Sequence, residues 1–526
     1  QADTRVLYST LLETQRSAFR IVLGLALLVV PVIALVLAYL LPTIRTFQLS
    51  RTEGLGVFAS TETVGNGNYD QAFADGRFVD SLLQLAGPTA LMVLTGAVLA
   101  PLAAWCLHRA GRRIRTTATV VWTLAAISLA PVALTVSWLI DRLVSESGRT
   151  ASIYDWPGLI AGVVLGTCVV ACLAALRGAT RPRRFAAVLV TAGLAAFALT
   201  AAGLQTFAYS SVSGLPADLA TPLVQIYEGI HSGWEPGTAA AKSMLLMAIL
   251  VPLGLGAAAL FAAARTRIDV IPGPADPAPA RPLAVLAGLA ALLVLLAAVG
   301  FFLLPWITRI GDGTVEGGNL WFIIRRTWGP PLVTTLIALP AAALGGYAIG
   351  ALRPLGDASH WLLLLFAPWL FIGSGPLGAA NLEAVAGEGE YVVVGSFPPR
   401  AWIAIPLLFV FAALFRGLEN RRREALALGT TPGSARLAFL NAAWPMLVLM
   451  GLVLLLVHVQ DLFWQQLTLQ DMLSAGPMTW ALKNLEFEHS GVALGFPGPI
   501  LAVYALAATA AAIWYLPRLA VKVGRD

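Results

Sequence analysis

The chain has 526 residues, of which 58% are apolar and only 12% are charged, and its mean hydropathy is +0.79. A soluble domain is about a quarter charged, so this composition excludes a water-soluble globular protein, and so apolar a chain cannot stay disordered in water. The net charge is +6. The three cysteines, Cys106, Cys168 and Cys172, lie within apolar runs, which favours neither a disulfide framework nor a zinc site.

Twelve stretches are long and apolar enough to cross a bilayer core about 30 Å thick as α-helices. The runs are continuous rather than alternating between polar and apolar residues, which indicates helices. We therefore expect an all-α polytopic membrane protein with about twelve transmembrane helices, at residues 19–41, 81–106, 118–140, 157–176, 185–206, 238–264, 282–304, 330–351, 361–380, 401–415, 445–465 and 491–515.

Lys and Arg gather in alternate loops, and this distribution orients the predicted helices. If the N-terminus is cytoplasmic, the inside segments hold 23 of the 34 basic residues and 8 acidic ones, a net of +15. The outside segments hold ten basic and 19 acidic residues, a net of −9. The opposite topology would reverse this gradient, so we expect both termini in the cytoplasm.

A charged, proline-rich segment divides six predicted spans from six. Residues 265–282 contain five prolines at near-alternate positions, which is typical of a stiff, solvated linker. We expect a first half at 1–267, a linker at 268–281 and a second half at 282–526. Because six is even, both halves enter the membrane from the same side, as parallel repeats that place a substrate path between them. An accidental proline-rich loop is the alternative.

The two halves differ in the loop before their fifth span. The second-half loop, residues 416–444, is long and contains two helical stretches separated by TTPGS, whereas its first-half counterpart is only residues 177–184. Thr431 or Ser434 is expected to cap the second of these helices. Two short helices on the cytoplasmic surface would form a docking knob for another protein. The alternative is a basic amphipathic stretch that lies on anionic lipid.

In this loop the chain resembles the membrane subunits of ATP-binding-cassette importers, whose EAA motif docks into a cleft on the ATPase. The matching residues are Glu424, Ala425, Gly429 and Pro432. Glu424 precedes Gly429 by five residues where the motif has six, and the first half lacks the loop. Residues 68–82 and 226–247 resemble segments of carbohydrate-type permeases, so the chain looks like a fusion of the maltose-type F and G subunits.

This resemblance implies a permease that has no catalytic residue or cofactor of its own. ATP would be hydrolysed by a cytosolic ATPase dimer, and an extracytoplasmic solute-binding protein would deliver a polar solute, such as a sugar, in the plasma membrane of a prokaryote. Membrane lipid is a further expected partner, and nucleic acid is not. The segment PGTAAAKS, residues 236–243, lacks both glycines of a phosphate-binding loop and opens a membrane span, so it is not a nucleotide site.

Polar residues inside predicted spans are candidates for the substrate path. His458, Asp461 and Gln465 follow i, i+3, i+7 spacing and would share one helix face, with Trp464 beside them. Amides and carboxylates bind hydroxyl groups, and aromatic faces cover an apolar sugar ring. The alternative is that these residues mark the outer end of the helix. Further candidates that line the path are Gln205, Tyr209, Trp138 and Trp369.

No catalytic or metal site is expected, because the five histidines are scattered and none pairs with another at helical spacing. Two other functions stay open. A secondary carrier of the major-facilitator type also has six plus six spans, and LHRAGRRIR, residues 107–115, keeps the basic part of its signature loop. A permease-derived scaffold that does not transport is the second alternative.

Overall fold

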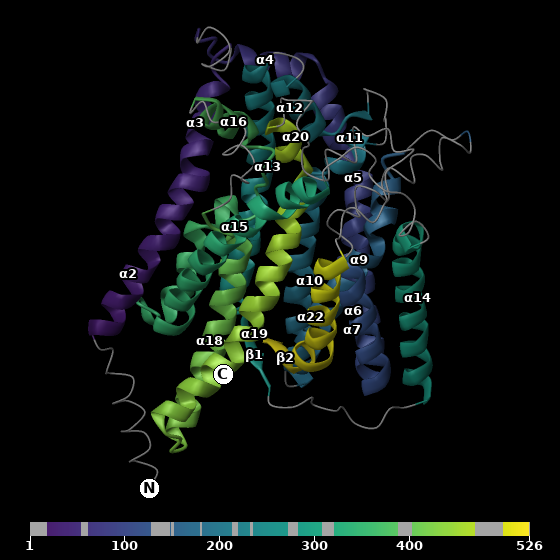
Figure 1. Ribbon diagram of the computed structural model, residues 1–526, viewed down its shortest axis with the longest axis vertical. Helices are drawn as coiled ribbons and strands as arrows, with labels where there is room; N and C mark the ends of the chain where they lie inside the picture. Colours follow the sequence, from purple (N-terminus) through teal and green to yellow (C-terminus); the bar gives the residue numbers. More distant parts are fainter. Residues whose placement is uncertain are drawn as a thin grey trace.

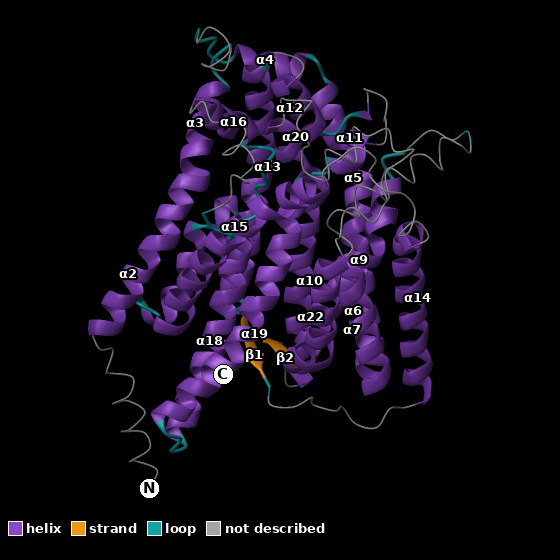
Figure 2. Ribbon diagram, in the orientation of Figure 1, coloured by secondary structure: helices purple, strands orange, loops and turns teal. Residues whose placement is uncertain are grey.

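The computed structural model describes residues 18–53, 62–127, 148, 152–178, 181–212, 219–231, 235–271, 282–307, 320–387, 402–468 and 498–524. Within these ranges nine helices are long and apolar enough to cross a membrane. They correspond to all the predicted spans except the third, ninth and tenth. The protein is therefore an all-α polytopic membrane protein, and its described strands form one small two-stranded sheet (Figure 2).

The first six predicted spans are built from α-helices, two of which contain a π-helical turn. Part of the third span, including Trp138, lies outside the described residues. The elements are α2 (Ala18–Leu35), η1 (Val36–Leu40), α3 (Leu41–Leu49), α4 (Gly67–Ala74), α5 (Arg77–Val93), η2 (Leu94–Leu99), α6 (Ala100–Arg109), α7 (Arg112–Ile127), α9 (Asp155–Gly178), α10 (Arg181–Leu204), α11 (Ala208–Val212), α12 (Pro222–His231) and α13 (Pro236–Ala263).

The second six spans are less regular. After strand β1 (Arg267–Val270), the elements are α14 (Pro282–Ile307), α15 (Leu320–Tyr347), η4 (Ala348–Leu352), η5 (Gly356–Leu365), η6 (Ala367–Trp369), α16 (Gly378–Gly387), α18 (Ile405–Ala427), α19 (Pro432–Val459), α20 (Leu462–Thr468), α22 (Gly498–Ala510), η8 (Ala511–Tyr515), η9 (Leu516–Arg518) and strand β2 (Leu519–Lys522).

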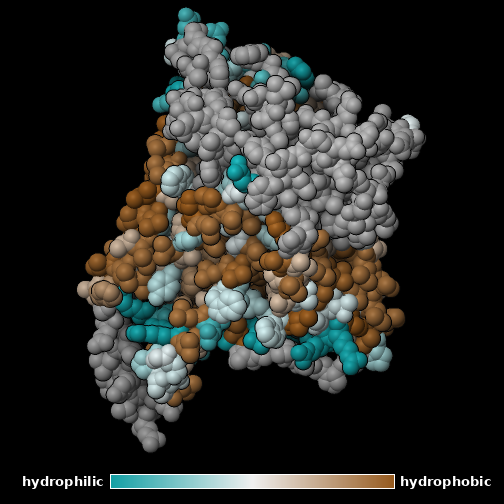
Figure 3. All heavy atoms as spheres, in the orientation of Figure 1, coloured by the Kyte–Doolittle hydropathy of each residue, from teal (hydrophilic) through white to brown (hydrophobic). Residues whose placement is uncertain are grey.

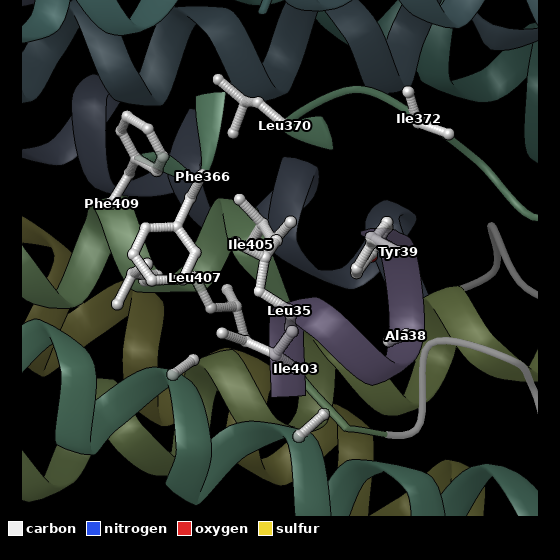
Figure 4. Packing of buried hydrophobic residues seen from close by; sticks show 14 of the residues in the cluster. Leu35, Ala38, Tyr39, Phe366, Leu370, Ile372, Ile403, Ile405, Leu407 and Phe409 are labelled. Atoms are coloured by element: carbon white, nitrogen blue, oxygen red, sulfur yellow. The ribbon is translucent and has the colours of Figure 1, made fainter. Parts of the chain in front are cut away.

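The predicted ninth span, residues 361–380, is not one helix, and that prediction was wrong. It consists of the 3₁₀ segments η5 and η6, then a non-helical stretch, then the start of α16. The sequence GSGP at 373–376 explains the break, because glycine and proline both disfavour a continuing helix. Figure 4 shows Phe366, Leu370 and Ile372 of this segment packed near Ile405 and Tyr39. From Phe366 onward the irregular backbone is therefore mostly packed in protein, as a membrane requires, whereas Trp361 and Leu365 of η5 are exposed.

The two halves interlock through their first spans. Helix α2 packs on α15 of the second half, whereas α14 packs on α6, α7 and α9 of the first half; Figure 1 shows α2 and α14 at opposite sides of the molecule. The contact between α9 and α14 is close, since a Cβ added at Gly162 would lie 2.8 Å from the backbone of Ala298. The first helix of each half, α2 or α14, therefore packs against helices of the other half.

The start of the predicted linker is part of an antiparallel ribbon. Strand β1 pairs with β2 near the end of the chain, with Arg267 opposite Lys522. The predicted boundary at 267/268 falls inside β1, whereas most of the proline-rich segment lies outside the described residues. Two glycines let the ribbon sit against the helices, because added Cβ atoms at Gly178 of α9 and Gly417 of α18 would lie 2.4 and 2.2 Å from ribbon carbonyl oxygens.

The surface has the apolar belt expected of a membrane protein. Figure 3 shows apolar side chains across the middle of the visible face, with hydrophilic side chains gathered below them. Exposed apolar residues on α2, such as Phe19, Val22 and Ile33, contribute to this belt. The arginine-rich end of the molecule is the one that carries the ribbon.

Candidate functional site

A cavity of about 480 Å³ lies between the two halves, near the ends of α10 and α19 that point away from the ribbon. This volume is in the range of small-molecule sites. The first half contributes α9, α10 and the segment after α10; the second contributes the broken ninth span and the junction of α19 with α20. Polar or aromatic lining residues include Trp156, Gln205, Thr206, Phe207, Phe371, Ser374, His458, Gln460, Asp461 and Phe463.

Gln205 connects the first half to the broken span. Its side-chain amide donates to the carbonyl oxygen of Phe371 at 2.7 Å and accepts from the backbone N–H of Gly373 at 2.8 Å. The same amide nitrogen donates to Ala201 O at 3.0 Å within α10. One glutamine thus satisfies two backbone groups that the missing helix leaves without partners. Gln205, which the sequence predicted as a lining residue, therefore lies on the cavity wall, and its hydrogen bonds also fix the backbone of the broken span there.

Asp461 lies where the predicted eleventh span is interrupted. Helix α19 ends at Val459, and α20 begins at Leu462. The Asp461 carboxylate accepts from Ser374 Oγ at 2.7 Å and from the Trp464 backbone N–H at 3.3 Å, so it caps α20 and binds the broken span.

The prediction that His458, Asp461 and Gln465 share one helix face was wrong, because the chain turns between the two helices. His458 and Asp461 still line the cavity. Gln465 instead points back and donates to Val459 O at 3.1 Å, and it is not among the lining residues.

Aromatic rings form part of the wall. Phe207 packs edge-on against Phe463, with ring centroids 5.1 Å apart, and Tyr227 lies behind them at 5.6 Å from Phe207. Trp156 stacks on Tyr209, which is fully buried and donates its hydroxyl to Asp155 Oδ2 at 3.1 Å. Tyr209 therefore supports the wall from outside the cavity. The arrangement combines amide, carboxylate and hydroxyl groups with aromatic faces.

Two other predicted residues, Trp464 and Trp369, do not line this cavity. Trp464 is buried in the core, and Trp369 donates its indole N–H to Thr43 Oγ1 at 3.0 Å; Trp138 lies outside the described residues. Sequence reasoning missed Ser374 and Phe371, although the Gly and Pro residues that interrupt this hydrophobic segment were a usable signal. Among the described residues no group of three or more metal-ligand side chains is placed to hold an ion.

The long loop is a helical hairpin, and the prediction of two short helices on the surface was wrong. Helix α18 runs from the core to Ala427, and α19 starts at Pro432 and returns into the membrane region. Figure 1 shows this hairpin extending past the lower ends of the neighbouring helices. Thr431 caps α19, since its side chain accepts from Ser434 N at 3.4 Å, as one of the two predicted alternatives had it.

The four EAA-like residues all lie near the tip of the hairpin. Gly429 adopts φ +90°, a left-handed conformation that ends α18; Pro432 opens α19, and Glu424 and Ala425 occupy the last turns of α18. Between them Leu428 is 87% exposed. The structure therefore presents a large apolar side chain at the apex of a stiff projection.

The base of the hairpin is held by a buried carboxylate. Glu419 is only 3% exposed and accepts from Arg422, Arg423 and, at 2.8 Å, Arg20 of α2. Burial acts to raise the pKa of Glu419, but the hydrogen bonds from Arg422, Arg20 and Arg423 and the charge of Arg422 outweigh it and lower the pKa to about 2. The carboxylate is thus ionised and joins the first helix of one half to the hairpin of the other.

Replacing Gln205 with leucine is expected to destabilise the protein by about 1–3 kcal/mol for each backbone group left unsatisfied, Phe371 O and Gly373 N. SDS titration in mixed micelles would measure the loss. Gln460→Leu is the control, because Gln460 lines the same cavity and no side-chain hydrogen bond of it is seen. Equal stability of the two variants would contradict the bracing role of Gln205.

Comparison with known proteins assigns no family to this chain. No protein-family model matches the sequence, and no curated protein is significantly similar to it. Among the described residues, the cavity between the halves and the projecting hairpin are the features that bear on function.

Proposed function

We propose that the protein is the membrane-spanning subunit of an ATP-driven importer and forms the path for a polar solute such as a sugar. The polar and aromatic cavity between the two halves carries this proposal. Gln205, Ser374, Asp461 and His458 supply hydrogen-bonding groups to hydroxyls, and Phe207, Phe463 and Trp156 supply apolar faces for a sugar ring.

The architecture supports alternating access. The cavity is lined from both halves, and its wall contains a broken helix, which is where transporters place their substrate sites. Rocking one half against the other would open the cavity to one side of the membrane and then the other. The exchange of first spans would keep the halves together during this motion.

The charge distribution supports a cytoplasmic position for the ribbon and the hairpin. Described arginines such as Arg177, Arg267 and Arg421 lie beside the ribbon at this end, and cytoplasmic loops are enriched in basic residues. This orientation puts both termini inside. The resemblance to importer subunits implies the plasma membrane of a prokaryote, where a solute-binding protein would approach the opposite end, at which α4 and α12 lie.

The hairpin favours a separate ATPase as the source of energy. Leu428 and the EAA-like residues form its tip, and Glu419 fixes its base, so a push at the tip would reach the core through one continuous helix, α18. The first-half counterpart is the pair α9 and α10, and it differs because the end of α9 at Gly178 lies against Val521 of the ribbon. The proposed ATPase dimer would therefore be engaged unequally by the two halves.

Alternating access can be tested without knowing the solute. Gln460→Cys, in a background with Cys106, Cys168 and Cys172 replaced by serine, should react with a membrane-impermeant maleimide, because residue 460 lines the cavity. In right-side-out vesicles from the native host, whose outer face is the cavity end of the molecule, ATP enclosed in the vesicles should change the labelling rate roughly tenfold as the populations of the two states shift. Leu293→Cys, on the exposed face of α14, is the control and should stay unlabelled.

A secondary carrier is the second candidate, and one observation favours it. Asp461 and His458, both able to carry a proton, line the same cavity. A labelling rate that responds to a proton or sodium gradient and not to ATP would replace the importer with this carrier. A rate that responds to neither would favour a scaffold that does not transport.

A further inference from the structure

A second, smaller pocket lies at the arginine-rich end of the molecule, away from the solute cavity. Its volume is about 190 Å³, and it is enclosed by α7, the end of α9 and the turn formed by η8 and η9. Four of its nine lining residues are arginines, Arg112, Arg115, Arg177 and Arg518, and two are threonines of α7. No carboxylate is among these lining residues. The pocket therefore concentrates positive charge; of the two threonine hydroxyls, that of Thr119 already donates to Arg115 O at 2.9 Å.

Two of the arginines are held in place by backbone carbonyl groups. Arg115 is 7% exposed and donates to His108 O at 3.3 Å. Arg177 donates through Nη1 to Leu516 O at 2.6 Å and to Leu519 O at 3.2 Å, and its other guanidinium N–H groups can reach a further acceptor. Arg112 and Arg518 are exposed at the rim. Fixed guanidinium groups of like charge repel one another, and an anion between them would remove that cost.

The remaining wall of the pocket is apolar and faces the membrane. Ile513 and Trp514 belong to the last turns of the candidate span Ile500–Arg518, and Trp514 is 71% exposed. Exposed tryptophan at the end of a span is typical of the headgroup level of a bilayer. The pocket thus offers cations at headgroup depth and an adjacent apolar surface for acyl chains.

We propose that this arginine pocket binds the phosphate of an anionic phospholipid from the leaflet at the ribbon end of the molecule. Guanidinium groups bind phosphate oxygens in a bidentate manner, and basic pockets between transmembrane helices suit anionic headgroups. The apolar wall at Trp514 distinguishes a lipid from a free anion, because only a lipid places acyl chains there.

Binding at this place has a structural consequence for the ribbon. Arg177 already holds Leu516 and Leu519, and Leu519 is the first residue of β2. A phosphate bound by Arg177 and Arg518 would connect α9 to the segment before β2. Through the arginines of α7 the same phosphate would also bind that helix. The lipid would thereby steady the ribbon that lies against both α9 and α18.

The test uses the full-length protein and phosphatidylglycerol as the probe, with bound lipid counted by native mass spectrometry. Arg112→Gln together with Arg518→Gln should weaken binding by roughly tenfold or more, since charge-assisted hydrogen bonds are lost. Both residues are exposed, so the fold should be kept. The matched control, Arg113→Gln with Arg436→Gln, removes the same charge from exposed arginines outside the pocket and should bind like wild type.

Two results would overturn the proposal. Equal loss of phosphatidylglycerol in the test and control variants would mean that only overall charge matters. Displacement of the lipid by millimolar inorganic phosphate, or equally tight binding of phosphatidylcholine, would mean that the pocket does not select an anionic lipid.

Discussion

A Glu419→Ala variant is expected to be about 3 kcal/mol less stable than the wild type, the lower end of the cost of breaking a buried ion pair. The carboxylate is 3% exposed and accepts from three arginines, so its removal takes away the acceptor that these three guanidinium groups share at the base of the hairpin. The arginines themselves are partly exposed and can turn to water, which is why the upper end of that range is not expected. SDS titration in mixed micelles measures the change.

The pH dependence of this loss follows from the lowered pKa of Glu419, about 2 in the folded protein against a usual 4.5. A carboxyl group with a lowered pKa contributes its full stabilisation above its unfolded pKa and loses it as the pH falls toward the folded value. The difference in the free energy of unfolding between wild type and Glu419→Ala should therefore be constant above about pH 4.5 and decrease as the pH falls from 4.5 to 2.

The control is Glu424→Ala, which removes an exposed carboxylate from the same helix. It should leave stability within about 0.5 kcal/mol of wild type. A Glu419→Ala variant as stable as this control, or a stability gap that does not change with pH, would show that the cluster does not hold the hairpin.

Hydropathy predicted most of the membrane helices because burial in lipid depends on composition over about 20 residues. It failed for residues 361–380, where the same average hides Gly373, Gly375 and Pro376, which break the helix. The length of α18 and α19 was also missed, because a charged continuation of a membrane helix lowers the hydropathy without ending the helix. Local helix propensity predicted this part better, because residues 423–428, REALAL, are mostly strong helix formers.

The cavity could be predicted only in part. Intramembrane polarity singled out Gln205, His458 and Asp461, and the structure brings these three to one cavity. Their partners could not be predicted, since Gln205 meets Phe371 across 166 positions and Asp461 meets Ser374 across 87. The β-ribbon was missed for a similar reason: four-residue strands carry little pattern of their own, and the pairing joins residues about 250 positions apart.

Replacing Leu428 with glutamate is expected to uncouple the protein from the proposed ATPase without unfolding it. Leu428 is 87% exposed at the apex of the hairpin, so its side chain has few internal contacts to lose. We expect Leu428 to act as a hot spot of the proposed contact, and a hot-spot residue contributes at least about 2 kcal/mol to binding; a buried charge would add to the loss. Association with the ATPase should weaken at least about 30-fold.

Two measurements check this result in membranes of the native host: the amount of ATPase that copurifies, and the ATP-dependent change in labelling of Gln460→Cys. Phe73→Glu is the matched control, since Phe73 is also exposed but lies on α4, at the opposite end of the molecule. It should retain the ATPase, which is the property that depends on the hairpin end of the molecule. The single substitution tests the tip of the hairpin alone. A deletion of residues 421–436 would also remove Arg421, which donates to Val270 O of the ribbon, and Arg422, which donates to Glu419. If Leu428→Glu keeps both ATPase and switching, the tip is not the coupling site, and energy must reach the cavity by another route.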